Sequence, residues 1–366
     1  MSEEQRQNEN CCEQLRDLLA SAVRQDASDI FLIPGMPAAF KIHGQIHSVD
    51  GRKLTPADTH SYVNTIYHHF TDGRSMERVL KTGDDDFSFA VDKLSRFRAS
   101  ILKQRGSLAA VIRVVQFDLP SPESLHIPES IINLSQFTKG LVLVTGPAGS
   151  GKSTTLACII DRINHTRNAH VITLEDPIEF LHRHDKSVVT QREIGLDTDS
   201  YVNGLRAALR QAPDVILLGE MRDYETIRIA MTAAETGHLV ISTLHTTGAA
   251  NTVDRIIDIF PANAQQQIRV QLSMVLQAVV SQQLVPTTDG SQIPAFELMF
   301  ANKAIRNLIR ESKIHQIDNV ISSGSSSGMI SMDNSLAALW KQGLITSDTA
   351  LTYCQESEQM KGKLRK

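Results

Sequence analysis

The sequence predicts an α/β protein built in two parts. The chain has 366 residues, more than one hydrophobic core usually holds, and 41% of them are hydrophobic. Short apolar strands at Leu141, Val171, Val215 and Leu239 alternate with helical segments, which is the pattern of a doubly wound parallel sheet. Alternating apolar residues between 87 and 115 predict an antiparallel sheet in a smaller part that precedes it.

The first part, residues 1–117, is expected to be a small α+β domain. Apolar residues recur with helical spacing over 15–23, and Thr55-Pro56 is typical of a helix start. A turn at 34–37 joins two short strands into a hairpin-like pair. Further strands are expected at 87–91, 97–101 and 109–115.

The second part begins after a proline-rich stretch. Pro120, Pro122 and Pro128 suit a semi-rigid linker or hinge, which we place at residues 118–137. A RecA-like core is then expected over 138–300, followed by a helical C-terminal region over 301–366. A run of serine and glycine at 322–328 predicts a flexible loop within that region.

Composition limits the partners and the compartment. The formal net charge is -4, so no global positive field favours nucleic acid, and none is expected as a partner. No apolar run approaches the roughly 18 residues of a membrane span, so direct membrane insertion is not expected. The four cysteines form no C-x-x-C pair, which favours a reducing cytoplasm.

One stretch predicts binding of a nucleoside triphosphate. Its glycines let the backbone curl so that several N–H groups face one anion, and Lys152 supplies a fixed positive charge. The apolar strand 141–144 precedes it and a helix over 156–163 follows, as a phosphate loop requires. A hydroxyl of Ser153 or Thr154 can reach Mg²⁺. The predicted phosphate loop consists of Gly146, Pro147, Ala148, Gly149, Ser150, Gly151, Lys152, Ser153 and Thr154.

Two acidic clusters follow predicted strands and could supply the carboxylates that hydrolysis needs. The first runs from Glu175 to Glu179, although an acidic surface loop would have the same composition. The second follows the strand 215–218, where Gly219 stands at a position that often holds aspartate, so Glu220 must serve the metal. An ordinary buried strand with a solvated end is the alternative. We therefore expect Ser153, Glu175 and Glu220 to be the candidate magnesium ligands.

Histidine and arginine side chains are further candidates. His238 and His245 bracket the strand 239–242 and could sense nucleotide by hydrogen bonding, although a packed or solvent-facing histidine is the alternative. Arginines gather on the last strands of the first part, where each could simply be solvated. If that part folds over the nucleotide, they can neutralise charge on the phosphates. They are Arg96, Arg98, Arg105 and Arg113.

Taken together, these motifs closely resemble those of the secretion-type traffic ATPases, and within them the PilT family, the type IV pilus retraction motors of twitching motility. The resemblance covers nearly the whole chain. It is carried by Ala27-Ser28-Asp29-Ile30, the phosphate loop, the Asp box Glu175 to Glu179, the run Gly219 to Asp223, and the His box Thr236 to Thr247. Ala148 departs from the threonine usual in this family's loop.

The resemblance implies a PAS-like N-terminal domain joined to a RecA-like ATPase domain, with six chains in a ring and ATP between the domains. It implies that Glu179 is the general base and that Glu220 is the Walker B carboxylate. Arg98 and Arg113 match positions from which the family's N-terminal arginines approach the γ-phosphate.

A segment near the C-terminus narrows the subfamily. By pattern alone it is an amphipathic helix, but as a string it matches a motif associated with pilus retraction. The resemblance then implies an inner-membrane platform protein as partner and, through it, pilin. The alternatives are a pilus-assembly or type II secretion ATPase, a RecA-like nucleic-acid translocase, or a non-catalytic scaffold. Assembly-type relatives typically carry a four-cysteine zinc module, which this chain cannot build. The segment is Ala304, Ile305, Arg306, Asn307, Leu308, Ile309, Arg310 and Glu311.

Overall fold

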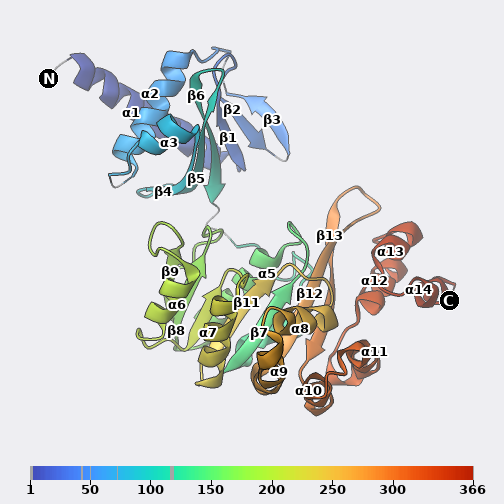
Figure 1. The fold of residues 1–366 in the computed structure, drawn as a ribbon. Coiled ribbons are helices and arrows are strands. Elements are labelled where there is room, and N and C mark those ends of the chain that lie inside the picture. Colours follow the sequence, from blue (N-terminus) through green and yellow to red (C-terminus); the bar gives the residue numbers. More distant parts are fainter. Residues whose placement is uncertain (1–2, 43, 50, 72, 116–118, 366) are drawn as a thin grey trace. The chain divides into compact units, whose positions relative to one another are not determined.

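The computed structural model describes residues 3–42, 44–49, 51–71, 73–115 and 119–365 (Figure 1). Contacts within the chain divide it into two compact units. The first comprises Met1–Asp118 with Glu179–Leu181, and the second comprises Leu119–Ile178 with His182–Lys366. The boundary expected after residue 117 falls among residues that the structure does not describe. Each unit is considered by itself below.

The first unit is an antiparallel sheet covered by helices, as the alternating pattern predicts. Its six strands lie in the order β3-β2-β1-β6-β5-β4, and every neighbouring pair is antiparallel. Helices α1 and α2 lie beside the sheet (Figure 1). Their apolar side chains join those of the strands in one core. The elements are α1 (Glu3–Arg24), β1 (Asp29–Leu32), β2 (Ala39–Ile42), β3 (Gln45–Ser48), α2 (Pro56–His69), α3 (Glu77–Thr82), β4 (Asp84–Val91), β5 (Ser95–Gln104) and β6 (Ser107–Val115).

The start expected for α2 is confirmed by its cap. The Thr55 hydroxyl accepts a hydrogen bond from the backbone N–H of Asp58, whose carboxylate accepts one from the Thr55 N–H in return. Such a reciprocal pair satisfies two of the donors that a helix start leaves open. Pro56 then occupies the first turn, where its missing N–H costs nothing.

The second unit contains the predicted parallel sheet. Strands β12, β7, β11, β10, β8 and β9 run parallel, and β13 pairs antiparallel with β12 at one edge. The RecA-like α/β fold class is therefore confirmed. The elements are α4 (Glu129–Ile132), η1 (Asn133–Gln136), β7 (Gly140–Thr145), α5 (Lys152–Thr166), β8 (His170–Glu175), β9 (Val188–Glu193), α6 (Tyr201–Ala208), β10 (Val215–Leu218), α7 (Tyr224–Glu235), β11 (Leu239–Leu244), α8 (Ala249–Asp258), α9 (Ala262–Val275), β12 (Leu276–Pro286) and β13 (Gln292–Phe300).

Most of the stretch expected as a linker belongs to the second unit. Ile127, Ile131, Ile132 and Leu134 are buried among side chains of β7 and α5. Although the stretch is rich in proline, its isoleucines and its leucine pack as core residues do. Residues 119–137 therefore form part of the second unit's core and surface, while Asp118 lies outside the described residues.

The C-terminal region is helical, as expected. The run 322–328, however, is not an irregular loop. Residues 322–323 end α11, and residues 324–327 form one 3-10 turn in which the Ser327 hydroxyl donates to the carbonyl of Gly324. The composition alone did not show these local hydrogen bonds. The elements are α10 (Lys303–Arg310), η2 (Ile314–Gln316), α11 (Ile317–Ser323), η3 (Gly324–Ser327), α12 (Met332–Lys341), α13 (Ser347–Tyr353) and α14 (Ser357–Leu364).

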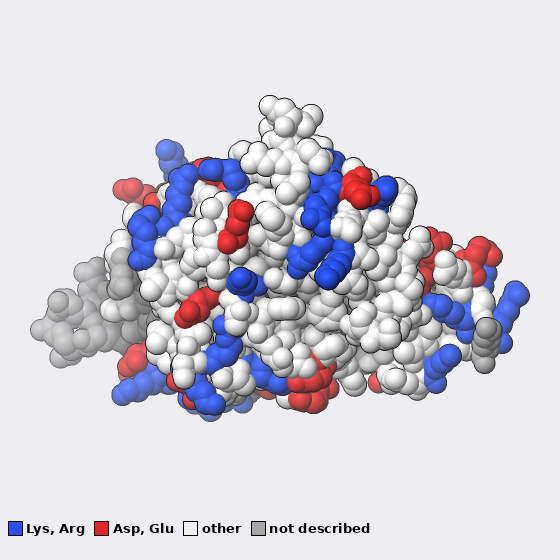
Figure 2. All heavy atoms as spheres, turned by 90° about the horizontal axis from the view of Figure 1, so that it is seen from below, with Lys and Arg blue, Asp and Glu red and all other residues white. Residues whose placement is uncertain are grey.

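Two observations on the surface bear on possible partners. Within the described residues, no helix combines the length and apolar character that crossing a bilayer requires. On the face drawn in Figure 2, groups of lysine and arginine are separated by acidic and uncharged side chains. The basic groups on that face therefore do not merge into the continuous stripe that typically tracks a nucleic-acid backbone.

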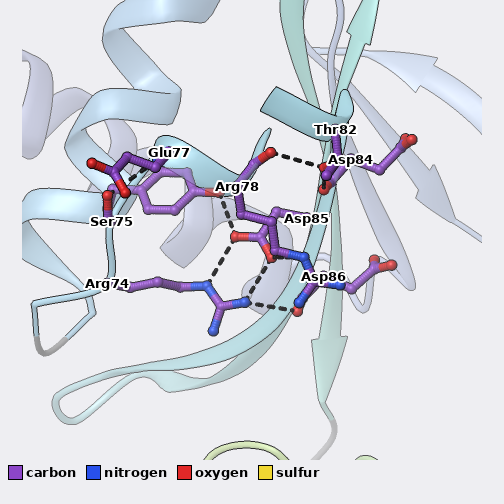
Figure 3. Close-up of polar contacts among 9 residues, drawn as sticks. Arg74, Ser75, Glu77, Arg78, Thr82, Asp84, Asp85 and Asp86 are labelled. Carbon is purple, nitrogen blue, oxygen red and sulfur yellow. Dashed lines mark hydrogen bonds and ion pairs between the residues drawn. The ribbon is translucent and has the colours of Figure 1, made fainter. Parts of the chain in front are cut away.

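A buried carboxylate organises one side of the first unit (Figure 3). Asp85 on β4 is 2% exposed and accepts hydrogen bonds from the Tyr67 hydroxyl at 2.7 Å and from Nε and Nη2 of Arg74 at 2.9 and 2.6 Å. Nε of Arg78 lies 3.5 Å from the same carboxylate. Burial raises the pKa of Asp85, but the Arg74 and Tyr67 hydrogen bonds and the two guanidinium charges outweigh it and hold the pKa below its ordinary value.

Replacing Asp85 by asparagine should destabilise the first unit by about 3 kcal/mol, because it leaves two arginines facing a neutral group. The stabilisation comes from a lowered pKa, so it is present above the pKa of the unfolded chain and is lost as pH falls through the folded-state value. Hydrogen exchange of peptides from β4 and β5 under increasing urea measures it. Asp86→Asn, on the exposed face of the same strand, is the control, and equal effects of the two substitutions would contradict the assignment.

Candidate nucleotide-binding site

The phosphate loop connects β7 to α5 and is shaped by two glycines that cannot carry a side chain. Gly146 has φ +146°, and a Cβ there would lie 2.1 Å from the backbone oxygen of Gln282. Gly151 has φ +86°, and a Cβ there would lie 2.8 Å from Nε2 of the same glutamine. Both positions lie in the left-handed or extended-positive region that glycine tolerates. The close approach of Gln282 and the positive φ angles therefore favour glycine at both positions.

The polar groups of this loop fit a phosphate. Nζ of Lys152 donates to the carbonyls of Gly146 and Pro147 at 2.9 and 2.8 Å, which holds its charge over the loop. Oγ of Ser150 is buried and has no hydrogen-bond partner among the described residues. The loop also ends at the N-terminus of the 15-residue helix α5, where a negative charge is favoured. A buried hydroxyl, a held ammonium group and a helix N-terminus are what a bound phosphate group would meet.

Gln282 on β12 is a site residue that the sequence analysis missed. It is 3% exposed, and its Oε1 accepts a hydrogen bond from the Thr155 hydroxyl in the first turn of α5 at 2.7 Å. The adjacent residue Ser281 pairs in register with Thr145, the last residue of β7. Gln282 thus touches the beginning of the phosphate loop with its backbone and the end of the loop with its side chain.

Carboxylates predicted from the two acidic clusters lie at the same edge of the sheet. Glu175 ends β8 and Glu220 follows β10, and these two strands are parallel neighbours. Glu220 contacts Nε2 of His245 at 3.3 Å and Nε of Arg222 at 2.5 Å. Oε1 of Glu175 accepts from the Thr173 hydroxyl at 2.6 Å. The structure therefore brings Glu220 and His245 together, at the carboxyl edge where open α/β sheets bind ligands.

A pocket of about 480 Å³ lies at this edge. Its charged or ionisable lining comes from the loop after β10, from the His box and from α8, which directly follows the His box in the sequence. These side chains are Glu220, Arg222, His245 and Arg255. Within the described part of the chain, no three His, Cys, Asp or Glu side chains form a complete metal-binding cluster. This finding is compatible with Mg²⁺, which proteins often hold through one or two carboxylates together with substrate phosphates.

The absence of aspartate at position 219 has a steric reason. A Cβ on Gly219 would lie 2.7 Å from the hydroxyl of Tyr201 and 3.3 Å from the carbonyl oxygen of Leu174. Burial, and then the charges of Glu220, Asp176 and Glu175, raise the pKa of Tyr201, so its neutral hydroxyl sits among the carboxylates. Tyr201 therefore occupies the space in which a side chain at position 219 would lie.

His238 lies apart from this group. It precedes β11, whereas His245 follows it, and its carbonyl oxygen accepts from the N–H of Gly140, the first residue of β7. Its ring nitrogen Nδ1 lies 3.0 Å from the carbonyl oxygen of Ala233. Because residues before and after a parallel strand lie at opposite edges of the sheet, His238 lies at the edge opposite to His245, and the hypothesis that His238 senses nucleotide stays a prediction.

The first unit places its two candidate arginines side by side. Arg98 on β5 and Arg113 on β6 are direct cross-strand partners, so both side chains leave the same face of the sheet. Nε of Arg113 donates to Asp29, which pairs with it from β1, at 3.0 Å. Asp29 belongs to the Ala27 to Ile30 string, which gives that string a role in orienting an arginine. Glu179 is exposed, and its role as general base stays a prediction.

The segment 304–311 forms the predicted amphipathic helix, with one unexpected contact. Ile305 and Ile309 are fully buried, as the pattern predicts. Nη1 of Arg306 donates to the carbonyls of Ser273 and Met274 at 2.5 and 2.8 Å, at the C-terminal end of α9. Arg306 therefore caps a neighbouring helix with positive charge. Ala304, Asn307, Arg310 and Glu311 remain exposed.

The fold and this site define a class of protein. A phosphate loop on a parallel RecA-like sheet, with carboxylates at the neighbouring strand ends, is the nucleotide site of an ATPase. Residues 4–318 match the family described as "Type II/IV secretion system protein", so the chain belongs to that family.

Within this family, the chain is similar to proteins of pilus retraction and twitching motility. The chain is 44% identical over 336 residues to the type IV pilus retractation ATPase PilT of Pseudomonas aeruginosa, covering 92% of this chain and 96% of that protein. It is also 44% identical to a twitching motility protein of Neisseria gonorrhoeae, covering 94% and 91%. The crystal structure of the pilus retraction motor PilT with bound ADP superposes with a TM-score of 0.87 at 44% identity, covering 94% and 98%.

Replacing Gln282 by alanine should weaken nucleotide binding by about 5- to 100-fold, which corresponds to roughly 1–3 kcal/mol for a lost buried hydrogen bond and a loosened loop. Titration of a non-hydrolysable ATP analogue into the folded protein measures the effect. Gln283→Ala is a matched control, because the next residue of β12 points to the other face of the sheet. Unchanged affinity in Gln282→Ala would mean that the glycines alone shape the loop.

Proposed function

We propose that this chain is the ATP-hydrolysing motor that retracts type IV pili and so drives twitching motility. The observation that carries the proposal is 44% identity over 92% of the chain to a pilus retraction ATPase. The 304–311 helix, with its matching string, supports retraction over assembly or export. The superposition with the ADP-bound PilT structure supports ATP as the nucleotide.

The side chains at the carboxyl edge of the sheet divide the work of hydrolysis. The phosphate loop and Lys152 bind and neutralise the phosphates, while Ser153, Glu175 and Glu220 are the candidates to hold Mg²⁺ directly or through water. When bound, Mg²⁺ would neutralise charge that develops on the transferred phosphoryl group. His245 orients Glu220 through their 3.3 Å contact. Glu179 is the proposed base that accepts a proton from the attacking water.

The paired arginines of the first unit supply the remaining positive charge. An arginine that reaches the γ-phosphate accelerates such reactions by roughly 10³- to 10⁵-fold. Asp29 holds Arg113 beside Arg98, so two guanidinium groups arrive together when the first unit closes on a nucleotide. In a homohexamer of this chain, hydrolysis would drive closure at the junction between the two units, and the need for these arginines would then couple hydrolysis to domain motion.

The motor would work at the cytoplasmic face of the inner membrane. Because hydrolysis moves domains rather than pilin itself, the motion must pass through an inner-membrane platform protein that contacts the pilus base. The exposed residues of the 304–311 helix are candidates for that contact. The mixed charges in Figure 2 give no support to a nucleic-acid translocase.

Two substitutions separate binding from chemistry. Lys152→Ala should abolish measurable nucleotide binding, because it removes the charge that the phosphate loop holds in place. Glu179→Gln should retain ATP binding but lower turnover by about 100-fold or more, the usual contribution of a general base. Steady-state phosphate release with Mg²⁺, alongside titration of an ATP analogue, measures both effects. Full turnover in Glu179→Gln would refute the assignment of the base.

Deletion of the gene should leave cells with surface pili that cannot twitch, because fibres are still assembled but not withdrawn. Electron microscopy of surface pili and a twitching-zone assay provide the readout. Complementation with the Lys152→Ala variant should not restore twitching. Cells that lose their pili would instead point to an assembly motor, and unchanged pili and motility would exclude both roles.

A further inference from the structure

A second buried carboxylate lies beside the His box and has no part in the chemistry described above. Glu297 on β13 is 1% exposed. Its Oε1 accepts a hydrogen bond from the backbone N–H of Ala249, the first residue of α8, at 2.7 Å. Helix α8 has no side-chain cap of its own, since Gly248 occupies the cap position. Glu297 therefore caps this helix from another strand, with its charge at the favourable end of the helix.

The capped helix begins where the His box ends. Its N-cap Gly248 follows Thr247, and the hydroxyl of Thr246 hydrogen bonds to that of Thr252 in α8 at 2.8 Å. The N–H of Gly248 also donates to the Ser281 hydroxyl, and Ser281 pairs with Glu297 across β12 and β13. Further along α8, Arg255 lines the pocket that contains Glu220 and His245. The position of the α8 N-terminus therefore determines the position of residues 246–248, which follow His245.

The other oxygen of Glu297 faces the C-terminal helices. Oε2 accepts a hydrogen bond from Nε2 of Gln355 at 3.0 Å. Gln355 lies between α13 and α14, and its backbone N–H donates to Asp333 of α12 at 2.8 Å. Asp333 also accepts from the N–H of Glu356 at 3.2 Å. One carboxylate therefore joins α8 on one side to the segment that connects three C-terminal helices on the other.

We propose that Glu297 is a positioning residue for ATP hydrolysis, through which the C-terminal helices α12–α14 control the position of α8 and of the His-box loop that carries His245. The inference rests on the ATPase activity proposed above. A displacement of the C-terminal helices, as on contact with a partner, pulls Gln355 from Oε2 and loosens the carboxylate that caps α8. The C-terminal region then acts on turnover without touching nucleotide.

The surroundings make this link sensitive to added charge. Burial raises the pKa of Glu297 and the nearby Asp318 raises it further, although the Ala249 and Gln355 hydrogen bonds oppose both effects. Burial and the charge of Glu356 likewise raise the pKa of Asp318. Asp318 and Glu356, which contribute to these shifts, are both acidic. Gln355 faces Glu297 as a neutral donor among these carboxylates.

The test exchanges the two partners. Gln355→Glu places a carboxylate against Glu297, and should lower kcat for ATP by about tenfold or more while the affinity for an ATP analogue changes by no more than about twofold. In the double variant E297Q/Q355E, the amide at position 297 can accept from Ala249 and donate to the carboxylate at position 355. Turnover should then recover to within about threefold of the parent protein.

Control variants and a second readout keep the outcomes distinct. Gln355 and Gln359 are both exposed, and Gln359→Glu makes the same charge change within α14, so it should keep parental turnover. Gln355→Ala removes the donor without adding charge, so its kcat should fall less than in Gln355→Glu. Hydrogen exchange of peptides covering 246–258 should rise in Gln355→Glu and return to parental values in the double variant.

Three results would overturn the inference. They are parental turnover in folded Gln355→Glu, a double variant no better than that single variant, or unchanged exchange over 246–258. A parent protein that binds nucleotide but does not hydrolyse it would instead refute the proposed function. In that case, hydrogen exchange over 246–258 still tests whether Gln355 and Glu297 hold the start of α8 in place, because hydrogen exchange does not depend on ATP turnover.

Discussion

The close passage of β12 beside the phosphate loop is the constraint on which the nucleotide site depends. Gly146 and Gly151 lie against the same glutamine, one against its backbone and the other against its side chain. Thr155 then ties the first turn of α5 to that side chain. Since protein interiors are close-packed, neither strand nor loop can shift alone. The shape of the loop is thus a property of the sheet as well as of the glycine-rich motif.

Parallel pairing explains how side chains far apart in sequence reach one edge. Glu175, Glu220 and His245 each lie at or just beyond the carboxyl end of a neighbouring strand. The same rule places His238, which precedes β11, at the opposite edge of the sheet. Beyond this edge, α8 connects the site to Glu297 and from there to the C-terminal helices. The parallel sheet therefore brings the candidate site residues to one edge, while the surrounding helices and β13 fix their positions.

Short sequence patterns were sufficient to predict the central strands of the parallel sheet and the phosphate loop. Short, mainly apolar runs indicated β7, β8, β10 and β11, and the glycine spacing indicated the phosphate loop. The hairpin β12–β13 was missed because Ser281, Gln282 and Gln283 interrupt an apolar run with polar residues. Two of these residues make polar contacts: Gln282 accepts from Thr155 in the first turn of α5, and Ser281 accepts from Gly248 at the N-cap of α8.

The same limit applies to individual site residues. Gln282 and Thr155 are 127 positions apart, and Glu297 and Gln355 are 58 apart, so no spacing in the sequence could pair them. By helical spacing, Arg306 lies off the stripe formed by Ile305 and Ile309, yet its side chain reaches the end of α9. A long flexible side chain can contact a residue outside its own helix. Helical periodicity predicts only the direction of its Cα–Cβ bond, not the position of its terminal group.

The contact between Gly219 and the Tyr201 hydroxyl links two positions that look independent in the sequence. An aspartate at position 219 has no room while the tyrosine is present, and a smaller residue at position 201 would leave a buried gap while the glycine is present. Replacing only Gly219 by aspartate, or only Tyr201 by a smaller residue, would therefore give a less well-packed protein. Substitutions at the two positions are therefore expected to be coupled, so that exchanging both residues together costs less stability than the two single exchanges would suggest.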